Sequence, residues 1–112
     1  MKTNIVADKS LCFWIAISKY SLLLNEKRYY GVSSQLFRSW TSIWANIRES
    51  IGAQSSKDFL HKLQIALKES YETDYWFEIL EKWFNEDVSM YKDDLREIIK
   101  LLVASIKTIK SK

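Results

Sequence analysis

The segment "RSWTSIWANIRES", residues 38–50, decides the fold, because its side chains recur with the period of an α-helix. Starting at Leu36, just before this segment, apolar side chains recur at steps of four, three and four residues: Leu36, Trp40, Ile43 and Ile47. Small and polar side chains follow at steps of three, four and three: Ser39, Ser42, Asn46 and Glu49. An apolar stripe and a separate small polar stripe on one helix predict two different neighbours for it.

The composition of the whole chain agrees with a helical fold. Its 112 residues suffice for a single domain, residues 1–112, with a buried core. The chain has no proline, two glycines, 47% hydrophobic and 28% charged residues, which favours helices and provides few turn formers. The one cysteine, Cys12, cannot form an intramolecular disulfide, so we expect a reducing, cytoplasmic location. The apolar run 11–24 contains Lys19 and is too short to cross a bilayer, so we expect no membrane association.

Start and stop signals divide the chain into four helical segments. We expect helices at about residues 8–24, 33–52, 55–84 and from 89 onward. Ser33 and Ser89 are candidate N-caps, and Ser55 with Asp58 three residues later resembles a capping box. Because the links between these helices are short, the sequence predicts an all-α fold, an antiparallel up-down four-helix bundle.

Each helix has an apolar stripe that can face the core of this bundle. On the first helix we expect it to be Leu11, Ile15, Ser18 and Leu22. On the third helix we expect it to be Phe59, Leu63, Ala66, Ser70, Phe77 and Phe84. On the fourth helix we expect it to be Tyr91, Leu95, Ile98, Leu102, Ile106 and Ile109.

The first and third helices each carry a second apolar stripe that a bundle core does not need. These extra stripes are Phe13, Ile17, Tyr20 and Leu24 on the first helix, and Ile65, Trp76, Ile79 and Trp83 on the third. An exposed apolar surface of this size usually marks a partner site. We therefore expect both stripes to form the interface of a closed homo-oligomer, with the fourth helix facing outward.

The sequence provides little for catalysis. A di-iron site in such a bundle needs two Glu-x-x-His pairs, whereas the nearest match is Asp58 with His61, the only histidine. Cys12 lies in an apolar run, where an inert buried thiol is commoner than a nucleophile paired with histidine. The chain has no glycine-rich phosphate loop, Cys-x-x-Cys pair or Gly-x-Ser-x-Gly turn. We expect no enzymatic activity, no metal or other cofactor and no small-molecule substrate.

Two carboxylates, Glu69 and Glu72, lie in the third helix close to apolar residues. They could act as a general acid–base pair, but such groups are more often held by arginine at a contact between helices or subunits. The residues that we expect in this polar network are Arg38, Asn46, Arg48, Glu69 and Glu72. We favour the structural interpretation.

The net charge of +3 is too small to identify a nucleic-acid-binding protein by itself. Residues 1–54 carry seven basic and three acidic side chains, and residues 55–98 carry six basic and eleven acidic ones. Residues 99–112 carry four basic side chains and no acidic one. This pattern fits either complementary surfaces within an assembly or solvated helix faces. The candidate contacts to RNA phosphates are Lys2, Lys9, Lys19, Lys27, Arg28, Lys100, Lys107, Lys110 and Lys112.

Three stretches of the chain are similar to a known family: "SSQLFRSWTSIWANIRES" (33–50), "SSKDFLHKLQIALKESYETDYWFEIL" (55–80) and "REIIKLLVASIKTIK" (96–110). The chain resembles four-helix bundle proteins encoded by intervening sequences of large-subunit (23S) ribosomal RNA genes. This family is often labelled as ribosomal and is related to the accessory proteins of diversity-generating retroelements. The chain departs from the family at Trp40 and Trp44, where small residues, or proline at the second site, are usual.

The resemblance implies a non-enzymatic homo-oligomer, with a pentameric ring as the expected form. For the retroelement relatives it implies binding to a reverse transcriptase and nucleic acid through a basic surface. For this chain we therefore expect association with RNA or a ribonucleoprotein. The alternative is a scaffold that binds a protein partner and has no role with nucleic acid. Phosphate contacts would make binding fall steeply with salt, so salt dependence separates the two hypotheses.

Overall fold

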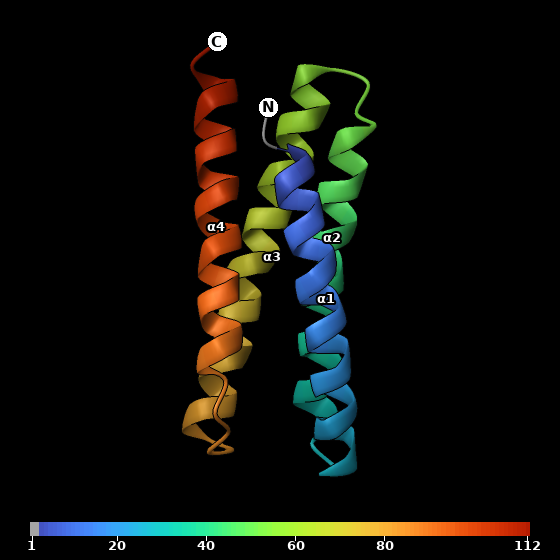
Figure 1. The fold of residues 1–112 in the computed structure, drawn as a ribbon, viewed down its shortest axis with the longest axis vertical. Helices are drawn as coiled ribbons and strands as arrows, with labels where there is room; N and C mark the ends of the chain where they lie inside the picture. The colour runs from blue at the N-terminus through green and yellow to red at the C-terminus, as the bar shows by residue number, and fades with distance from the viewer. Residues whose placement is uncertain (1–2) are drawn as a thin grey trace.

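The computed structural model describes the backbone of residues 3–112 and the side chains from Asp8 onward. It consists of four helices, α1 (Thr3–Glu26), α2 (Tyr30–Ile51), α3 (Ser56–Lys82) and α4 (Ser89–Lys110). Successive helices run in opposite directions along a bundle of 47 × 20 × 19 Å (Figure 1). The predicted up-down four-helix bundle is confirmed.

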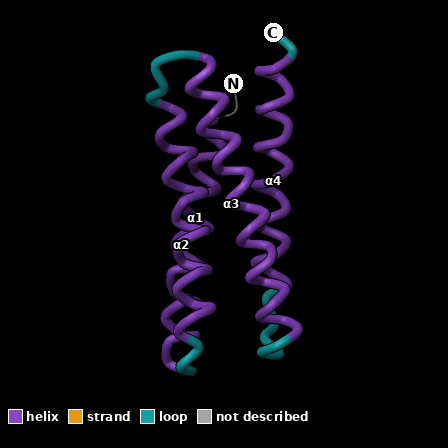
Figure 2. Tube along the Cα trace, turned by 180° about the vertical axis from the view of Figure 1, so that it is seen from behind, coloured by secondary structure: helices purple, strands orange, loops and turns teal. Residues whose placement is uncertain are grey.

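The helices follow one another around the bundle in chain order. α2 packs most extensively against α3 and then against α1, whereas α1 and α4 share the smallest contact. Seen from behind, α1 and α2 form one pair and α3 and α4 the other (Figure 2). α2 and α4 lie on opposite corners, and their backbones do not approach each other closely in the part of the chain described.

The start of α3 follows the predicted cap. The Ser55 hydroxyl accepts a hydrogen bond from the Asp58 backbone N–H at 3.1 Å, which satisfies one free donor of the first turn. The Asp58 carboxylate accepts a bond from the backbone N–H of Gln54 at 3.3 Å. In a standard capping box this carboxylate accepts from the backbone N–H of the cap residue, which here is Ser55. In this chain it accepts from the N–H of the preceding residue instead.

The other two predicted caps are wrong. α2 begins at Tyr30, so Ser33 lies inside its first turn, where its buried hydroxyl donates to the carbonyl of Ser21 on α1 at 3.0 Å. Ser89 is the first residue of α4, and its backbone N–H and hydroxyl both donate to Asp87, at 3.1 and 2.7 Å. Both serines match a capping pattern by sequence, but each hydroxyl donates a hydrogen bond elsewhere instead of accepting one from the first turn.

The predicted core faces of three helices are buried. On α2 the apolar stripe of the opening segment is 2% exposed or less: Leu36, Trp40, Ile43 and Ile47. On α3 and α4 the buried members are Leu63, Ala66, Ser70, Phe77, Leu95, Ile98, Leu102 and Ile106. These residues form one continuous core along the bundle.

The predicted faces of α1 are exchanged. The stripe expected at a subunit interface lies in the core of the chain itself, with Ile17, Tyr20 and Leu24 buried and Phe13 packed against them. The stripe expected in the core is outside, because Leu11 and Leu22 are 43% and 63% exposed. Both stripes are apolar, so hydropathy does not rank them, and partners on the other helices decide which one turns inward.

Candidate functional site

A polar cluster joins α2 to α3 near the middle of the bundle. The guanidinium of Arg38 lies 3.5 Å from the Glu69 carboxylate and also pairs with Glu72. Its Nε donates to the side chain of Gln35 at 3.2 Å, and the indole of Trp76 donates to Glu72 at 3.2 Å. The structure thus brings together Arg38 and both glutamates, and one cation bridges the two carboxylates.

Arg48 does not join this cluster within the chain. The hydroxyl of Thr73 on α3 donates to the Ser39 hydroxyl on α2 at 2.8 Å, which sets the register of the two antiparallel helices. Arg48 lies ten residues beyond Arg38, so it leaves α2 on a different side of the helix. Its side chain is exposed, and the prediction that it pairs with Glu69 or Glu72 inside the subunit is wrong.

Asn46 also lies outside the cluster. Its side-chain amide donates to the backbone carbonyl of Ser42 at 2.9 Å and to the Ser42 hydroxyl at 3.2 Å. Both bonds stay within one turn of α2, so this side chain satisfies itself locally instead of linking helices.

A second polar cluster, which was not predicted from the sequence, lies at the end of the bundle that holds the α1–α2 and α3–α4 connections. It joins α1 to the α3–α4 connection. The Tyr20 hydroxyl donates to Glu86 at 2.8 Å, and the Lys27 amine donates to the other oxygen of Glu86 at 2.6 Å. Burial, followed by the bond to Glu86, raises the pKa of Tyr20, and the bond from Lys27 lowers the pKa of Glu86. The partners are 59 and 66 residues apart, so no local pattern could reveal them.

The basic residues proposed to contact RNA do not form one surface. Lys27 and Arg28 lie at the α1–α2 connection, whereas Lys107 and Lys110 lie in the last turns of α4, at the opposite end of the bundle (Figure 1). Lys9 is paired with Glu97 on α4 at 2.6 Å. Lys19 is exposed on α1.

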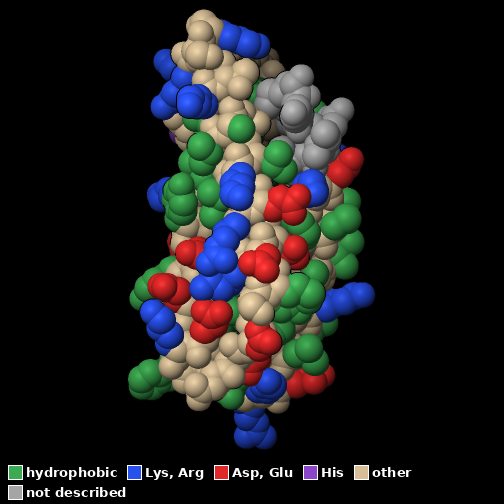
Figure 3. Space-filling model, turned by 60° about the vertical axis from the view of Figure 1, so that its left-hand side comes forward, with side chains coloured by type: hydrophobic (Ala, Val, Ile, Leu, Met, Phe, Trp, Pro, Cys, Tyr) green, Lys and Arg blue, Asp and Glu red, His purple; other side chains and the backbone are tan. Residues whose placement is uncertain are grey.

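Figure 3 shows how these charges are distributed around α4. Lys and Arg side chains gather at the upper end, where α4 finishes, and acidic and basic side chains mix below it. Hydrophobic side chains collect toward both edges of this view rather than along its centre.

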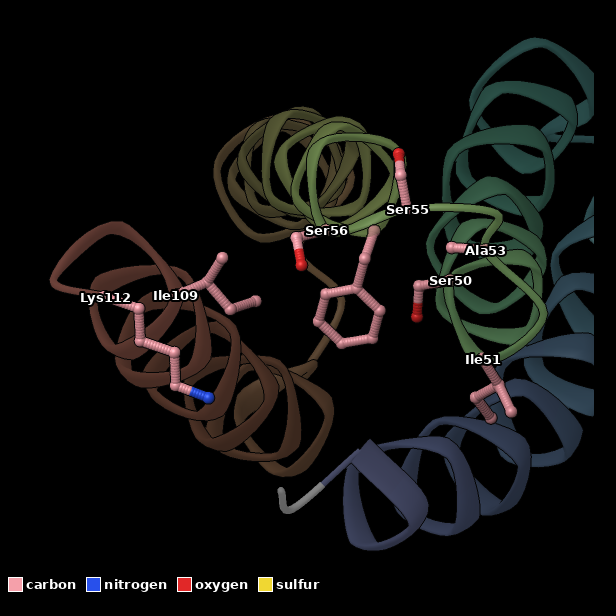
Figure 4. Close-up of a pocket in the computed structure, with 8 residues that line it drawn as sticks. Ser50, Ile51, Ala53, Ser55, Ser56, Ile109 and Lys112 are labelled. Atoms are coloured by element: carbon pink, nitrogen blue, oxygen red, sulfur yellow. The ribbon is translucent and has the colours of Figure 1, made fainter.

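A hollow of about 460 Å³ opens at the same upper end. It lies between the α2–α3 connection and the end of α4 (Figure 4) and is lined by Ser50, Ile51, Ala53, Ser55, Ser56, Phe59, Ile109 and Lys112. Lys112 is the one titratable side chain in this lining. A general acid and a general base do not meet here, so the lining suits binding better than proton transfer.

Two apolar surfaces flank α2. The first, which we call the α1–α2 groove, is a hollow of about 450 Å³ lined by Ser18, Ser21, Leu22, Asn25, Tyr30, Ser33, Ser34 and Phe37. Its large hydrophobic side chains are exposed: 63% for Leu22, 62% for Tyr30 and 41% for Phe37. On the same side of α1, Leu11 and Ile15 are also exposed.

The second surface, which we call the α3 patch, consists of Tyr75, Ile79 and Trp83 on the other flank of α2. Trp83 is 79% exposed and Tyr75 is 56% exposed, whereas Ile79 is half-buried. Of the other α3 residues predicted at an interface, Ile65 and Trp76 are half-buried within the chain. Of the four α3 residues predicted at the interface, Trp83 is exposed and the other three are half-buried.

No group of three or more His, Cys, Asp or Glu side chains in the described part of the chain is placed to hold a metal ion. Within the same residues, no helix is long and apolar enough to cross a membrane. Cys12 is exposed on α1, contrary to the buried thiol expected from the sequence.

The chain is similar to known proteins in both its sequence and its fold. The family profile of the 23S rRNA-intervening sequence protein matches residues 2–104. The chain belongs to this family. This member of the 23S rRNA-intervening sequence family is also similar to a solved structure, the crystal structure of a protein of unknown function from the S23 ribosomal protein family of Bacteroides thetaiotaomicron. That protein is 47% identical, with a TM-score of 0.88 over 96% of this chain and 99% of its own. A search of curated proteins gave no match.

Proposed function

We propose that this 23S rRNA-intervening sequence family protein is a non-enzymatic building block that assembles into a closed homo-oligomer. The observation that supports the proposal is the pair of exposed apolar surfaces on the two flanks of α2. Monomeric soluble proteins rarely expose large contiguous apolar patches, and Leu22, Tyr30 and Trp83 each leave more than half of their surface in water.

The two surfaces differ from each other, which favours a head-to-tail contact. A contact between unlike surfaces builds a ring when the rotation between subunits closes. With both contacts beside α2, that helix would face the ring axis and α4, on the opposite corner, would face outward with its charged side chains in water. The family resemblance supplies the number of subunits, which we propose to be five.

The absence of enzymatic activity is part of the same proposal. The two carboxylates that could have formed an acid–base pair, Glu69 and Glu72, both lie against the guanidinium of Arg38. This arrangement serves the packing of α2 on α3.

Light scattering on the full chain tests self-association. We expect a mass several times 13.3 kDa for the native protein and a smaller, folded species for Leu22→Asp. Met90→Asp is the matched control, because Met90 is 65% exposed on α4 and carries the same change outside both surfaces. A native mass of one chain at micromolar concentration contradicts the proposal.

The second candidate function is association with RNA or a ribonucleoprotein, and a specific observation favours it. Basic side chains gather at the end of the bundle where α4 finishes: Arg48, Lys57, Lys107, Lys110 and Lys112. All subunits of a ring have the same orientation along its axis, so the basic ends would lie together on one face. Several weak phosphate contacts on one face add to a much stronger combined affinity.

Binding of a labelled single-stranded RNA, followed by fluorescence anisotropy, tests this second function. We expect the affinity to fall steeply between about 50 and 200 mM salt, and to fall again in Lys110→Glu. Lys68→Glu, an equal charge change on an exposed site of α3, should leave it nearly unchanged. An RNA affinity that changes neither with salt nor in Lys110→Glu would favour a protein scaffold without a nucleic-acid role.

A further inference from the structure

The hollow between the α2–α3 connection and the end of α4 combines a small apolar wall with hydroxyl groups. Phe59 and Ile109 are half-buried in its lining and pack against the core from α3 and α4. Three of its eight lining residues are serines: Ser50, Ser55 and Ser56. Its volume of about 460 Å³ lies within the range of roughly 300–1,000 Å³ that is usual for ligand sites in proteins. The hollow is therefore large enough for a ring compound and offers it apolar contact and hydrogen bonds.

The serine hydroxyls of this hollow differ in what they can still bind. Ser50 is fully buried, and its hydroxyl donates to the carbonyl of Ile47 at 2.6 Å. Ser56 is exposed, and Figure 4 shows its hydroxyl facing the hollow from α3. A hydroxyl can both donate and accept, so Ser56 suits an occupant with polar groups at its edge.

The charges around the hollow favour an anionic occupant. Lys112 belongs to the lining, and Figure 4 shows its side chain projecting from the end of α4 together with Ile109. The two acidic side chains of α2 and α3 at this end already have partners, because Glu49 lies 3.8 Å from Lys62 and Asp58 accepts from the backbone N–H of Gln54. The other basic side chains at this end are Arg48, Lys57, Lys107 and Lys110.

We propose that an unpaired nucleotide of a single-stranded RNA enters this hollow, with its base against Phe59 and its phosphate at Lys112. The inference rests on the proposed association with RNA and names the part of the RNA that the hollow receives. Proteins commonly hold single-stranded nucleic acid by stacking its bases on aromatic side chains within a basic surface that follows the phosphates. This end of the bundle has both elements.

The hydroxyl groups distinguish a nucleotide from a lipid. A fatty acid would also bring an anion to Lys112, but its acyl chain offers no hydrogen bond to the serines of the lining. The edge of a nucleobase carries donors and acceptors around a flat apolar ring. A nucleotide therefore matches the apolar wall, the hydroxyls and the charge of the hollow at once.

Two labelled oligomers with the same number of phosphates test the insertion: a short oligoadenylate and an abasic ribose-phosphate chain. Their binding to the full chain is followed by fluorescence anisotropy. Contacts to phosphates alone would give both oligomers the same affinity. Because the base adds stacking, we expect the oligoadenylate to bind roughly fivefold more tightly or better.

Substitutions at Phe59 and Lys112 separate the base contact from the phosphate contact. Phe59→Ala removes the ring, and Phe59→Leu removes its flat face while it keeps most of the packing. We expect both to weaken oligoadenylate binding by roughly five- to tenfold and to leave abasic binding unchanged. Lys112→Gln should weaken binding of both oligomers and reduce the salt dependence by about one phosphate contact.

Tyr71→Ala is the aromatic control, because Tyr71 is 55% exposed on α3 and does not line the hollow, so it should bind both oligomers like the native chain. Circular dichroism and thermal unfolding check that each variant folds. Equal affinity of the native chain for the two oligomers, or unchanged oligoadenylate affinity in every folded Phe59 variant, would overturn the insertion while RNA association stands. If neither oligomer binds, both proposals fail.

Discussion

The hydroxyl of Tyr20 donates a hydrogen bond to Glu86 at 2.8 Å and joins residues that are 66 positions apart. Around this bond, the Tyr20 ring lies 4.9 Å from that of Tyr91, and Lys27 pairs with the free oxygen of Glu86. The arrangement ties α1 to the connection between α3 and α4. Because α1 has two apolar faces of similar character, this partner explains why the face with Tyr20 turns inward.

Tyr20→Phe keeps the ring in the core and removes the donor to Glu86. A hydrogen bond to a charged group contributes about 1.5–3 kcal/mol, so we expect the free energy of unfolding to fall by an amount in the lower part of that range. Urea denaturation measures it. Tyr71→Phe, at a side chain 55% exposed on α3 and outside both apolar surfaces, is the control and should change little. An unchanged midpoint for Tyr20→Phe would show that the bond does not stabilise the bundle.

The pH dependence of stability should show the contribution of Glu86. Hydrogen bonds from Lys27 and Tyr20 lower its pKa in the folded chain below the ordinary value of 4.5. A lowered folded pKa means that the stabilisation is complete above the ordinary pKa and is lost as the pH falls through the folded pKa. We expect the stability difference between the native chain and Glu86→Gln to be largest near neutral pH and to shrink in acid. A difference that grows in acid would reverse the sign and contradict the assignment.

Trp40 is the central aromatic side chain of the core. It is 2% exposed, with the rings of Phe13 and Phe77 at 6.4 and 6.3 Å. Trp40→Ala leaves a large cavity and should lower the free energy of unfolding by about 3–5 kcal/mol. Trp44 is half-buried, so the same change there should cost less. Thermal or chemical unfolding compares the two variants, and an unchanged melting temperature for Trp40→Ala would contradict the assigned face of α2.

The indole N–H of Trp40 has no acceptor among the described residues, so no hydrogen bond compensates for the loss of its contact with water. We therefore expect Trp40→Phe to cost much less than Trp40→Ala. The same unfolding experiment measures it.

Arg38 and Glu69 provide a test of coupling between α2 and α3. The Glu69 side chain is 15% exposed, so loss of its cation leaves a largely buried charge. We expect Arg38→Met to destabilise the chain more than Arg38→Met combined with Glu69→Gln, with a coupling on the order of 1 kcal/mol in a double-mutant cycle. Arg48→Met is the matched control, because Arg48 is an exposed arginine on another side of α2, and its cycle with Glu69 should show no coupling. Zero coupling for Arg38 as well would mean that the pair does not link the helices.

Local sequence patterns were sufficient for the helices and for three of their four core faces. The step pattern through Trp40 and Ile43 on α2 and the single stripe through Leu95 and Ile98 on α4 have only one apolar side each. Burial of that side follows from hydrophobic periodicity alone. Part of the polar cluster could be predicted in the same way, since Arg38 is a cation on α2 and Glu69 is an acid on the helix that follows.

Tertiary structure decided the features in which two local choices have similar energies. α1 offers two apolar faces, and the one with Ile17 and Tyr20 is chosen by distant partners such as Glu86. Arg48 and Arg38 are equivalent cations by sequence, but only Arg38 lies on the side of α2 that meets Glu69 and Glu72. Residue spacing defines which side chains share a helix face, whereas the register and rotation of packed helices define which faces meet, and these depend on contacts between residues far apart in the chain.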